Sequence, residues 1–523
     1  MSNDVFMTEK TTTGTIHIAH SLKKNITANF AGTIWQALMG ILFIPLYIKF
    51  LGIESWGLIG IFATLQGIFS LLDLGLTGTL NRELARLSVL PQKEQEMRNL
   101  VRTLEILYWS VAAFVGIAII ALSPFIAGYW IKSGSLSSAT VEQALVFMGI
   151  ITAFQMPGGF YSGGLMGLQK QVKLNGINIG VSTVRGAGAV LILWLISPTI
   201  QAFFLWQILT SIVSVFLIGY SLWHALPVSD TKGVFQKVLL HGVWRFAAGM
   251  SGITILGIVL TQLDKIILSK MLTLEMFGYY MLAGVVAMSL GRLFTPVFYS
   301  IYPRLTQLVS INNQEELIRL YHKSCQFFAV LILPAAIVLS FFSYEVILLW
   351  TQNPVTAEKT HLIVSIMIFG TALNGLVNPP YALQLAYGWT KLPFYVNLVS
   401  VVLFVPLIIL LATYFGAIGG AIAWLVLNMG FILVWIPVMH QRLLRTEQWR
   451  WYWQDVFVPL ITGVVVAGIG RLIVNQPYSQ MMMVLELCCV SVITLGMTAL
   501  SMPVTRAWMF EQAAKISFGQ HKR

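Results

Sequence analysis

One arginine lies in the middle of an apolar run of this sequence. Arg185 is the single charged residue between Ile177 and Ser197. A charge at the centre of a membrane-spanning helix costs roughly 2.5–3.5 kcal/mol on insertion scales. A charged residue at this position is therefore expected to have an interaction partner or a functional role. Asn178, Ser182 and Arg185 recur at the i, i+4 and i+7 positions that share one helix face. In a membrane, such a polar face is expected to line a cavity or to contact a neighbouring helix.

Arg292 is a second arginine deep inside an apolar run, on a predicted helix face with Ser289 and Tyr299. It falls in a different helix of its half of the chain, so it is not a repeat counterpart of Arg185. The sequence offers no acid at matching depth, which favours a cavity over a buried ion pair. Because guanidinium holds phosphate oxygens through paired hydrogen bonds, both arginines are candidates for binding an anionic substrate.

Three more ionisable residues fall inside apolar runs. Asp264 and Lys265 are adjacent, toward the outer third of their run, and could equally be interface residues that reach water. Asp73 precedes the cytoplasmic end of its run by about two helical turns and could pair with Arg82. We take Lys265 as a candidate substrate ligand, and Asp73 and Asp264 as candidates for coupling to a cation gradient.

For two other sets of residues we predict a structural role and no part in transport. Arg471 and Glu486 come near the outer ends of consecutive predicted helices and are expected to pair. The three cysteines form no spaced cluster and predict neither a disulfide framework nor a metal site.

The elements that position these residues are set by composition. Hydrophobic residues make up 57% of the 523 and charged residues only 10%, whereas soluble domains average about 25% charged. Runs of about 20 apolar residues, each long enough to cross a bilayer, recur along the chain. The fourteen predicted spans are centred near Met39, Leu65, Val115, Thr152, Gly186, Ile212, Ile258, Ser289, Leu333, Thr371, Leu403, Asn428, Val465 and Val490. This count requires a tight turn near Phe415–Gly419.

We interpret the net charge of +12 as an indication of membrane topology and not of nucleic-acid binding. With both ends on one side, that side collects 24 Lys and Arg residues and the opposite side 4. Basic residues mark the cytoplasmic side, so both termini are predicted to be cytoplasmic. Residues 1–20 lack the apolar core of a cleavable signal peptide.

The sequence also contains a weak internal repeat. Leu51–Leu58 (LGIESWGL) resembles Leu272–Tyr279 (LTLEMFGY), and the same offset of 221 residues pairs Gly167 with Gly388. The offset covers six spans, an even number, so the second six enter the membrane in the same orientation as the first. Such a parallel repeat is typical of transporters whose halves rock about a central site.

We therefore predict an all-α polytopic membrane protein with about 14 transmembrane helices, in two six-helix lobes plus a C-terminal helix pair. No connection has room for a folded domain of ~50 residues or more, and no phosphate-binding P-loop is present. Neither a cofactor nor ATP hydrolysis is expected. The predicted parts are a cytoplasmic segment 1–28, a first lobe 29–223, a linker 224–245, a second lobe 246–440, a linker 441–455, a helix pair 456–502 and a cytoplasmic tail 503–523.

A family resemblance rests on Asn29–Leu87, where LGIESWGL is followed by LLDLGL and NRELAR, and on QLDKIILSKML followed by FGYYMLA. These motifs resemble the Wzx-type O-antigen and capsule flippases of the multidrug/oligosaccharidyl-lipid/polysaccharide superfamily, over about residues 25–440. The resemblance implies a multi-pass bacterial inner-membrane transporter, not an enzyme. It implies movement of an undecaprenyl-diphosphate-linked oligosaccharide from the cytoplasmic to the periplasmic leaflet by alternating access. A polysaccharide polymerase and a chain-length regulator are the implied partners, beside membrane lipids, and no nucleic acid.

Other functions stay open at this point. A lipid II-type flippase has the same fold and a diphosphate cargo. A cation-coupled multidrug antiporter of the same superfamily should prefer acids in its cavity. A membrane-embedded polymerase or ligase would need a large periplasmic loop, and a scaffold for glycan assembly would not need Arg185 at the midplane. The energy source, a proton or sodium gradient or none, is also open.

Overall fold

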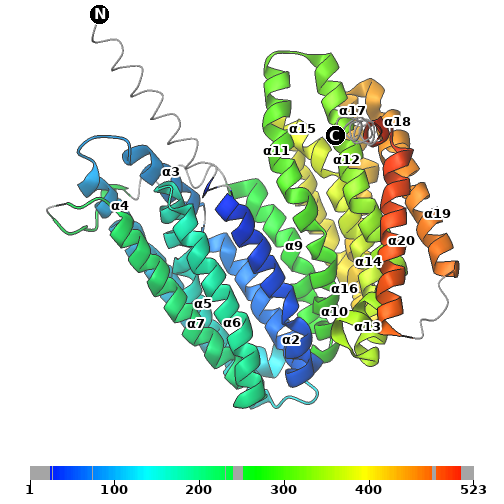
Figure 1. Ribbon diagram of the computed structural model, residues 1–523. Helices are drawn as coiled ribbons and strands as arrows, with labels where there is room; N and C mark the ends of the chain where they lie inside the picture. Colours follow the sequence, from blue (N-terminus) through cyan, green and yellow to red (C-terminus); the bar gives the residue numbers. More distant parts are fainter. Residues whose placement is uncertain are drawn as a thin grey trace, which may run out of the picture. The chain divides into compact units, whose positions relative to one another are not determined.

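The computed structural model describes residues 24–25, 27–73, 75–229, 231–239, 251–473, 479–507 and 510 (Figure 1). The described residues are 89% helical, with no β-strand among them, which confirms the predicted fold class. By its internal contacts the chain divides into two compact units, Met1–Ile258 and Val259–Arg523. The lobe boundary predicted at residue 246 lies outside the described residues.

The first unit is a helical bundle organised around one central helix. Helix α5 contacts α3, α4 and α7, and α6 packs on α7. Residues 27–42 are also helical. The elements are α2 (Ile44–Phe69), η1 (Ser70–Asp73), α3 (Leu76–Leu87), α4 (Glu94–Phe125), η2 (Ile126–Trp130), α5 (Ser138–Gly167), α6 (Gln171–Leu195) and α7 (Ile200–Ala225).

The second unit is built around α12 and α14, which pack on each other; α12 also contacts α19 and α20, the C-terminal helix pair. The first element, α9 (Ser251–Met271), crosses the unit boundary. The others are α10 (Leu274–Ser289), α11 (Gly291–Ser310), α12 (Gln314–Phe341), α13 (Ser343–Thr351), α14 (Pro354–Leu376), α15 (Asn378–Ala386), α16 (Lys391–Gly430), η3 (Phe431–Trp435), α17 (Ile436–Leu443), η4 (Arg445–Glu447), α18 (Gln448–Arg450), η5 (Trp451–Phe457), α19 (Val458–Ile473) and α20 (Gln480–Ser501).

Two glycines interrupt long helical stretches. Gly52 (φ 80°, ψ 163°) breaks α2, and Gly416 (φ 57°, ψ −130°) breaks α16. Residues with a side chain rarely adopt either conformation. A Cβ at Gly419 would lie 2.1 Å from the carbonyl oxygen of Leu411, so the chain folds back on itself there. The turn predicted near Phe415–Gly419 is confirmed.

The breaks at Gly52 and Gly416 explain how the observed helical stretches correspond to the fourteen predicted spans. Eleven helical stretches in the described ranges are long and apolar enough to cross a membrane. The stretch Lys391–Leu443 contains the reversal at Gly416 and so makes two crossings. The helix that begins near residue 27 and runs to Gly52, together with α9, supplies the remaining two. The described part of the chain thus agrees with about 14 helices.

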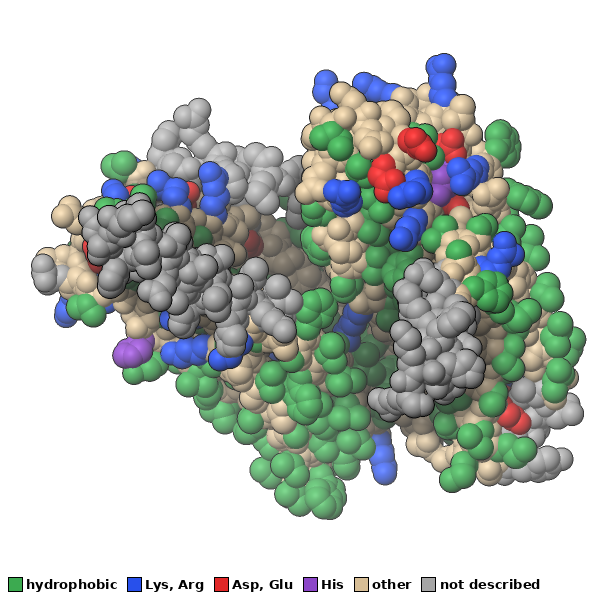
Figure 2. Space-filling model, turned by 45° about the horizontal axis from the view of Figure 1, so that its top comes forward, with side chains coloured by type: hydrophobic (Ala, Val, Ile, Leu, Met, Phe, Trp, Pro, Cys, Tyr) green, Lys and Arg blue, Asp and Glu red, His purple; other side chains and the backbone are tan. Residues whose placement is uncertain are grey.

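Side-chain chemistry follows this architecture. Figure 2 shows charged side chains gathered over the end of the second unit where Figure 1 labels α17 and α18, and mostly hydrophobic side chains along its flank. Exposed hydrophobic side chains recur along the long helices, as in Leu191, Trp194 and Leu195 of α6. An apolar flank of this kind is the surface expected of a multi-pass membrane protein.

Gly419→Ala should destabilise the fold, because its new Cβ cannot fit against the Leu411 backbone. Overpacking of this kind costs typically about 1–3 kcal/mol, and thermal unfolding of the purified protein in detergent would measure it. Gly430→Ala is the matched control, because a Cβ at this position of the same helix meets no atom within 4 Å. Equal melting temperatures for the two variants would contradict the tight reversal.

Candidate functional site

Arg185 lies near the middle of α6, an unbroken helix, so Asn178, Ser182 and Arg185 do share one face. All three are half-buried. The Ser182 hydroxyl donates to the Ile179 carbonyl of its own helix (3.0 Å). The Nε of Arg185 is buried without a hydrogen-bond partner. A buried, unsatisfied guanidinium N–H is costly unless a ligand accepts from it.

The helix is held in place on both sides of Arg185. The Tyr47 hydroxyl of α2 donates to the Gly186 carbonyl (3.1 Å), and the Trp206 Nε1 of α7 lies 3.2 Å from the carbonyl oxygens of both Val184 and Arg185. A Cβ at Gly188 would lie 2.3 Å from the Trp206 ring, so the glycine allows this close approach. These contacts fix the depth and rotation of Arg185.

Arg292 lies near the start of α11, directly after Leu290, whose backbone is helical (φ −58°, ψ −33°) and continues from Ser289 at the end of α10. Arg292 is exposed and belongs to the other unit from Arg185. Its role as a substrate ligand stays a prediction.

Asp264 and Lys265 form an ion pair in the second unit, in which Asp264 is buried and Lys265 half-buried. The Lys265 Nζ lies 3.1 Å from Asp264 Oδ1 and donates to the Thr261 carbonyl (2.5 Å), while the Tyr280 hydroxyl donates to Asp264 Oδ2 (2.5 Å). Asp264 is only 4% exposed. The ammonium of Lys265 is thus bound by groups of its own helix, and its role as a substrate ligand stays a prediction.

Asp73 lines a cavity of about 530 Å³ within the first unit. Its Oδ1 accepts hydrogen bonds from the Thr77 N–H (3.3 Å) and from the hydroxyls of Thr77 and Tyr108. Two hydroxyl groups and a backbone N–H therefore bond one oxygen of the carboxylate. The polar residues that line the cavity are Gln66, Ser70, Asp73, Thr77, Tyr108, Thr152 and Gln155.

The two corresponding second spans of the repeat differ in regularity. In the first unit, α2 gives way to η1 after Phe69, and Gly75 (φ 76°) precedes α3. In the second unit, Leu290 alone separates α10 from α11, 221 residues after Phe69, and its backbone stays helical (φ −58°, ψ −33°). Interrupted membrane-spanning helices are typical of the functional sites of transporters. Asp73 lies at the interruption in the first unit.

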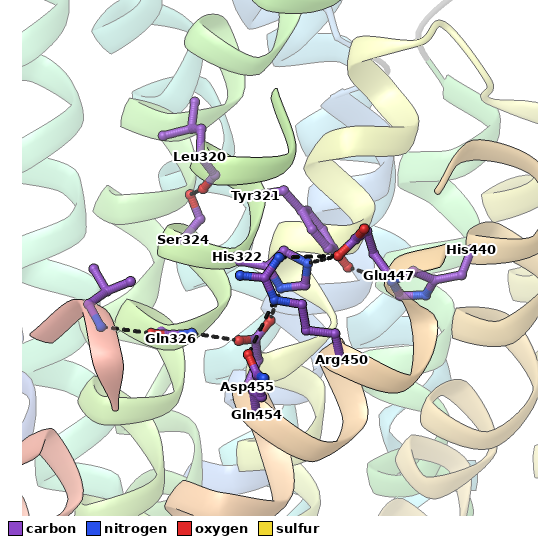
Figure 3. A network of polar contacts seen from close by, with 11 residues as sticks. Leu320, Tyr321, His322, Ser324, Gln326, His440, Glu447, Arg450, Gln454 and Asp455 are labelled. Atoms are coloured by element: carbon purple, nitrogen blue, oxygen red, sulfur yellow. Dashed lines mark hydrogen bonds and ion pairs between the residues drawn. The ribbon is translucent and has the colours of Figure 1, made fainter. Parts of the chain in front are cut away.

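A polar cluster at one end of α12 was not anticipated from the sequence (Figure 3). The His322 ring places Nδ1 2.5 Å from Asp455 and Nε2 3.0 Å from Glu447. Arg450 lies 3.4 Å from the same Glu447 oxygen. Helical spacing could not reveal the cluster, because 125 and 133 residues separate His322 from its two acids.

Arg471 has a different partner from the expected one. Its guanidinium forms an ion pair with Glu345 of α13, and not with Glu486 of α20. The Glu486 Oε2 atom is buried without a hydrogen bond. Sequence proximity favoured the neighbouring helix, whereas packing brings α13 to this arginine.

An all-helical bundle of long apolar spans, with polar groups buried inside each unit, is the fold of a membrane transporter. The chain belongs to the polysaccharide biosynthesis protein family, whose model matches residues 22–309. The MatE family model matches residues 253–410. The resemblance to Wzx-type polysaccharide flippases of the larger superfamily is thereby confirmed at the level of the family.

Relatives and solved structures agree with this assignment. A Shigella flexneri protein provisionally named as an O-antigen transporter is 22% identical over 408 residues, which cover 77% of this chain and 94% of that protein. The inward-closed lipid II flippase MurJ has a similar fold, with a TM-score of 0.64, 14% identity and 90% and 97% of the two chains covered. An inward-facing multidrug resistance MATE family transporter gives a TM-score of 0.61, with 13% identity and 84% and 94% covered.

Replacing either member of the Asp264–Lys265 pair alone should destabilise the protein more than replacing both. A buried charge without its partner costs about 3–5 kcal/mol, so Asp264→Asn and Lys265→Met should each lower the melting temperature. The double variant should recover part of the loss. Glu83→Gln is the control, because its exposed pair with Arg86 contributes at most about 1 kcal/mol. Additive losses would show that the two charges do not depend on each other.

Proposed function

We propose that this protein is a flippase that moves a lipid-diphosphate-linked oligosaccharide from the cytoplasmic to the periplasmic leaflet of the bacterial inner membrane. The observation that carries the proposal is the Arg185 guanidinium, mid-helix, held in register by Tyr47 and Trp206, with its buried Nε unsatisfied. An anionic group that passes α6 would supply the missing acceptor. A phosphate suits this role, because guanidinium binds its oxygens in bidentate fashion.

The substrate class follows from the family and from this chemistry together. A polysaccharide biosynthesis family and a relative named for O-antigen transport support a glycan as the cargo. A polar glycan crosses a membrane on a lipid carrier whose diphosphate is its charged part, and undecaprenyl diphosphate is the carrier that the resemblance implies. Asn178 and Ser182 would offer hydrogen bonds beside Arg185 on the same helix face.

Transport by alternating access would require the two units to move relative to each other. The interruption after Phe69, where Gly75 is left-handed, offers a hinge for such a motion in the second span of the first unit. The biased distribution of Lys and Arg supports cytoplasmic termini. The polymerase and the chain-length regulator would then act on the product at the periplasmic side.

Asp73 is the group we assign to cation coupling. It sits at the hinge between η1 and α3, beside an internal cavity, and its Oδ1 accepts from the first turn of α3. A proton or sodium ion bound to this carboxylate would weaken its hold on Thr77 and Tyr108. Cation binding would thereby change the bend of the second span.

Arg185→Ala should reduce export of the lipid-linked glycan about tenfold to hundredfold, because charge-assisted hydrogen bonds contribute about 1.5–3 kcal/mol. The test complements a deletion strain of the native host and measures polyprenyl-diphosphate-linked glycans by mass spectrometry, with an impermeant periplasmic probe for the leaflet. Complete repeat units should accumulate on the cytoplasmic face. Lys173→Ala, an exposed charge on the same helix, is the control and should export normally.

The same experiment separates the alternatives. Normal export by a stably inserted Arg185→Ala variant would overturn the phosphate role of this residue. Unchanged lipid-linked glycans in the deletion strain, with new sensitivity to cationic drugs, would instead identify a multidrug antiporter. Single repeat units accumulating on the periplasmic face would identify a polymerase.

Asp73→Asn should abolish the dependence of flipping on an ion gradient. In proteoliposomes that hold the purified protein and its extracted lipid-linked glycan, wild-type flipping should respond to an imposed proton or sodium gradient, and the variant should not, because the amide carries no charge to titrate. Glu83→Gln keeps Asp73 and should respond as the wild type does. If flipping by Asp73→Asn still responded to the ion gradient, a residue other than Asp73 would couple transport to the cation.

A further inference from the structure

The polar cluster around His322 joins four separate segments of the second unit at one end of α12 (Figure 3). His322 itself is 2% exposed and Asp455 0%. Glu447 belongs to η4, Arg450 to α18 and Asp455 to η5, so the acids come from the connection between α17 and α19. The cluster is therefore where the C-terminal helix pair begins its contact with α12.

The two contacts of the His322 ring require one proton more than a neutral imidazole and two carboxylates carry. Each ring nitrogen faces a carboxylate oxygen, at 2.5 Å for Asp455 and 3.0 Å for Glu447. An ionised carboxylate can only accept hydrogen bonds. Both nitrogens must then donate, which only the doubly protonated imidazolium can do. With His322 and Arg450 positive and the two acids negative, the four side chains sum to zero charge.

The nearby His440 shows the contrasting arrangement. Its Nδ1 lies 3.0 Å from the Ile436 carbonyl, which can only accept, and its Nε2 lies 3.0 Å from the Tyr321 hydroxyl, which can donate. A neutral imidazole satisfies both contacts. The requirement for a bound proton is thus specific to the histidine between two acids.

Further contacts extend the cluster to the last helix. The Gln326 Nε2 donates to the second oxygen of Asp455 (2.9 Å), and its Oε1 accepts from the Val504 N–H just beyond α20 (3.2 Å). Asp455 reaches α12 from η5, a π-helical segment, and such segments are rare and frequently mark functional positions. Both ends of the C-terminal helix pair therefore depend on α12 through Asp455 and Gln326.

We propose that His322, Asp455 and Glu447 form a proton-binding site whose occupancy fastens the C-terminal helix pair to α12. When the proton leaves one ring nitrogen for water, that nitrogen presents a lone pair to a carboxylate. The cluster then carries one net negative charge beside the almost fully buried His322 and Asp455, where an uncompensated charge is strongly unfavourable. Separation of η5 from α12, which lets water reach the acids, relieves this cost. The contact is therefore stable at lower pH and is lost as pH rises.

Other titratable groups near the ring do not supply the missing proton. Tyr321 and His440 are bonded to each other, and Arg450 is positive in either state. Cys325 is 3% exposed, one helical turn from His322 on α12. Its thiol lies against Trp451 of η5. Movement of η5 away from α12 should therefore expose the thiol, which makes it a native reporter of the contact.

The test measures modification of Cys325 by N-ethylmaleimide in the full-length protein with Cys488→Ala and Cys489→Ala, which removes the two exposed thiols. Mass spectrometry gives the rate between about pH 6 and about pH 9, divided by the rate for the denatured protein at each pH to cancel thiol ionisation. The normalised rate should be low at acid pH. It should then rise, approaching about tenfold per pH unit, as linkage to one proton requires.

Three variants in this background separate proton binding from simple packing. Asp455→Asn should label slowly at every pH, because the new amide donates to an unprotonated Nδ1 while Nε2–H still donates to Glu447. His322→Gln should label rapidly at every pH. Glu316→Gln, in an exposed ion pair on the same helix, should follow the parent protein. A normalised rate that is independent of pH in the parent, or an unchanged pH dependence in Asp455→Asn, would overturn the proposal.

Discussion

The cost of an unpaired charge away from water governs this structure. Lipid supplies neither hydrogen bonds nor counter-ions, so each ionisable side chain inside a span must find its partner within the protein. Asp264 meets this requirement with Lys265 and Tyr280, Arg471 with Glu345, and Asp73 with hydroxyl groups. Arg185 is half-buried, but its Nε is a buried donor without an acceptor, and for this reason it carries the proposed transport role.

The same constraint explains where the helices break. A backbone that leaves the helical conformation inside a membrane exposes polar groups that must be satisfied, so breaks are confined to places with a local solution. At the first break, the side chain of Asp73 caps the turn that begins α3, and Gly75 adopts the left-handed conformation. In the first unit, a helix interruption and a polar side chain therefore occur together.

The likeness to the lipid II flippase and to MATE transporters shows the shared fold, and the residues inside that fold distinguish this chain. A mid-helix arginine suits an anionic passenger, and a carboxylate at a hinge suits a cation. The His322 cluster adds a third kind of site, in which the C-terminal helix pair is attached through charge and not only through apolar packing. Attachment by charge can respond to protonation, which apolar contact cannot.

The sequence by itself determined the helical class, the approximate number of spans, the turn at Gly416 and the polar face of α6. These features depend on periodicity and on residues close in the chain, and a helix preserves such relations wherever it packs. Only the tertiary structure decided that Arg471 meets Glu345 and that Arg292 lies exposed. It also brought His322 to Asp455 across 133 residues. Partners of this kind are chosen by how helices pack, and the spacing of residues along one chain does not encode which faces will meet.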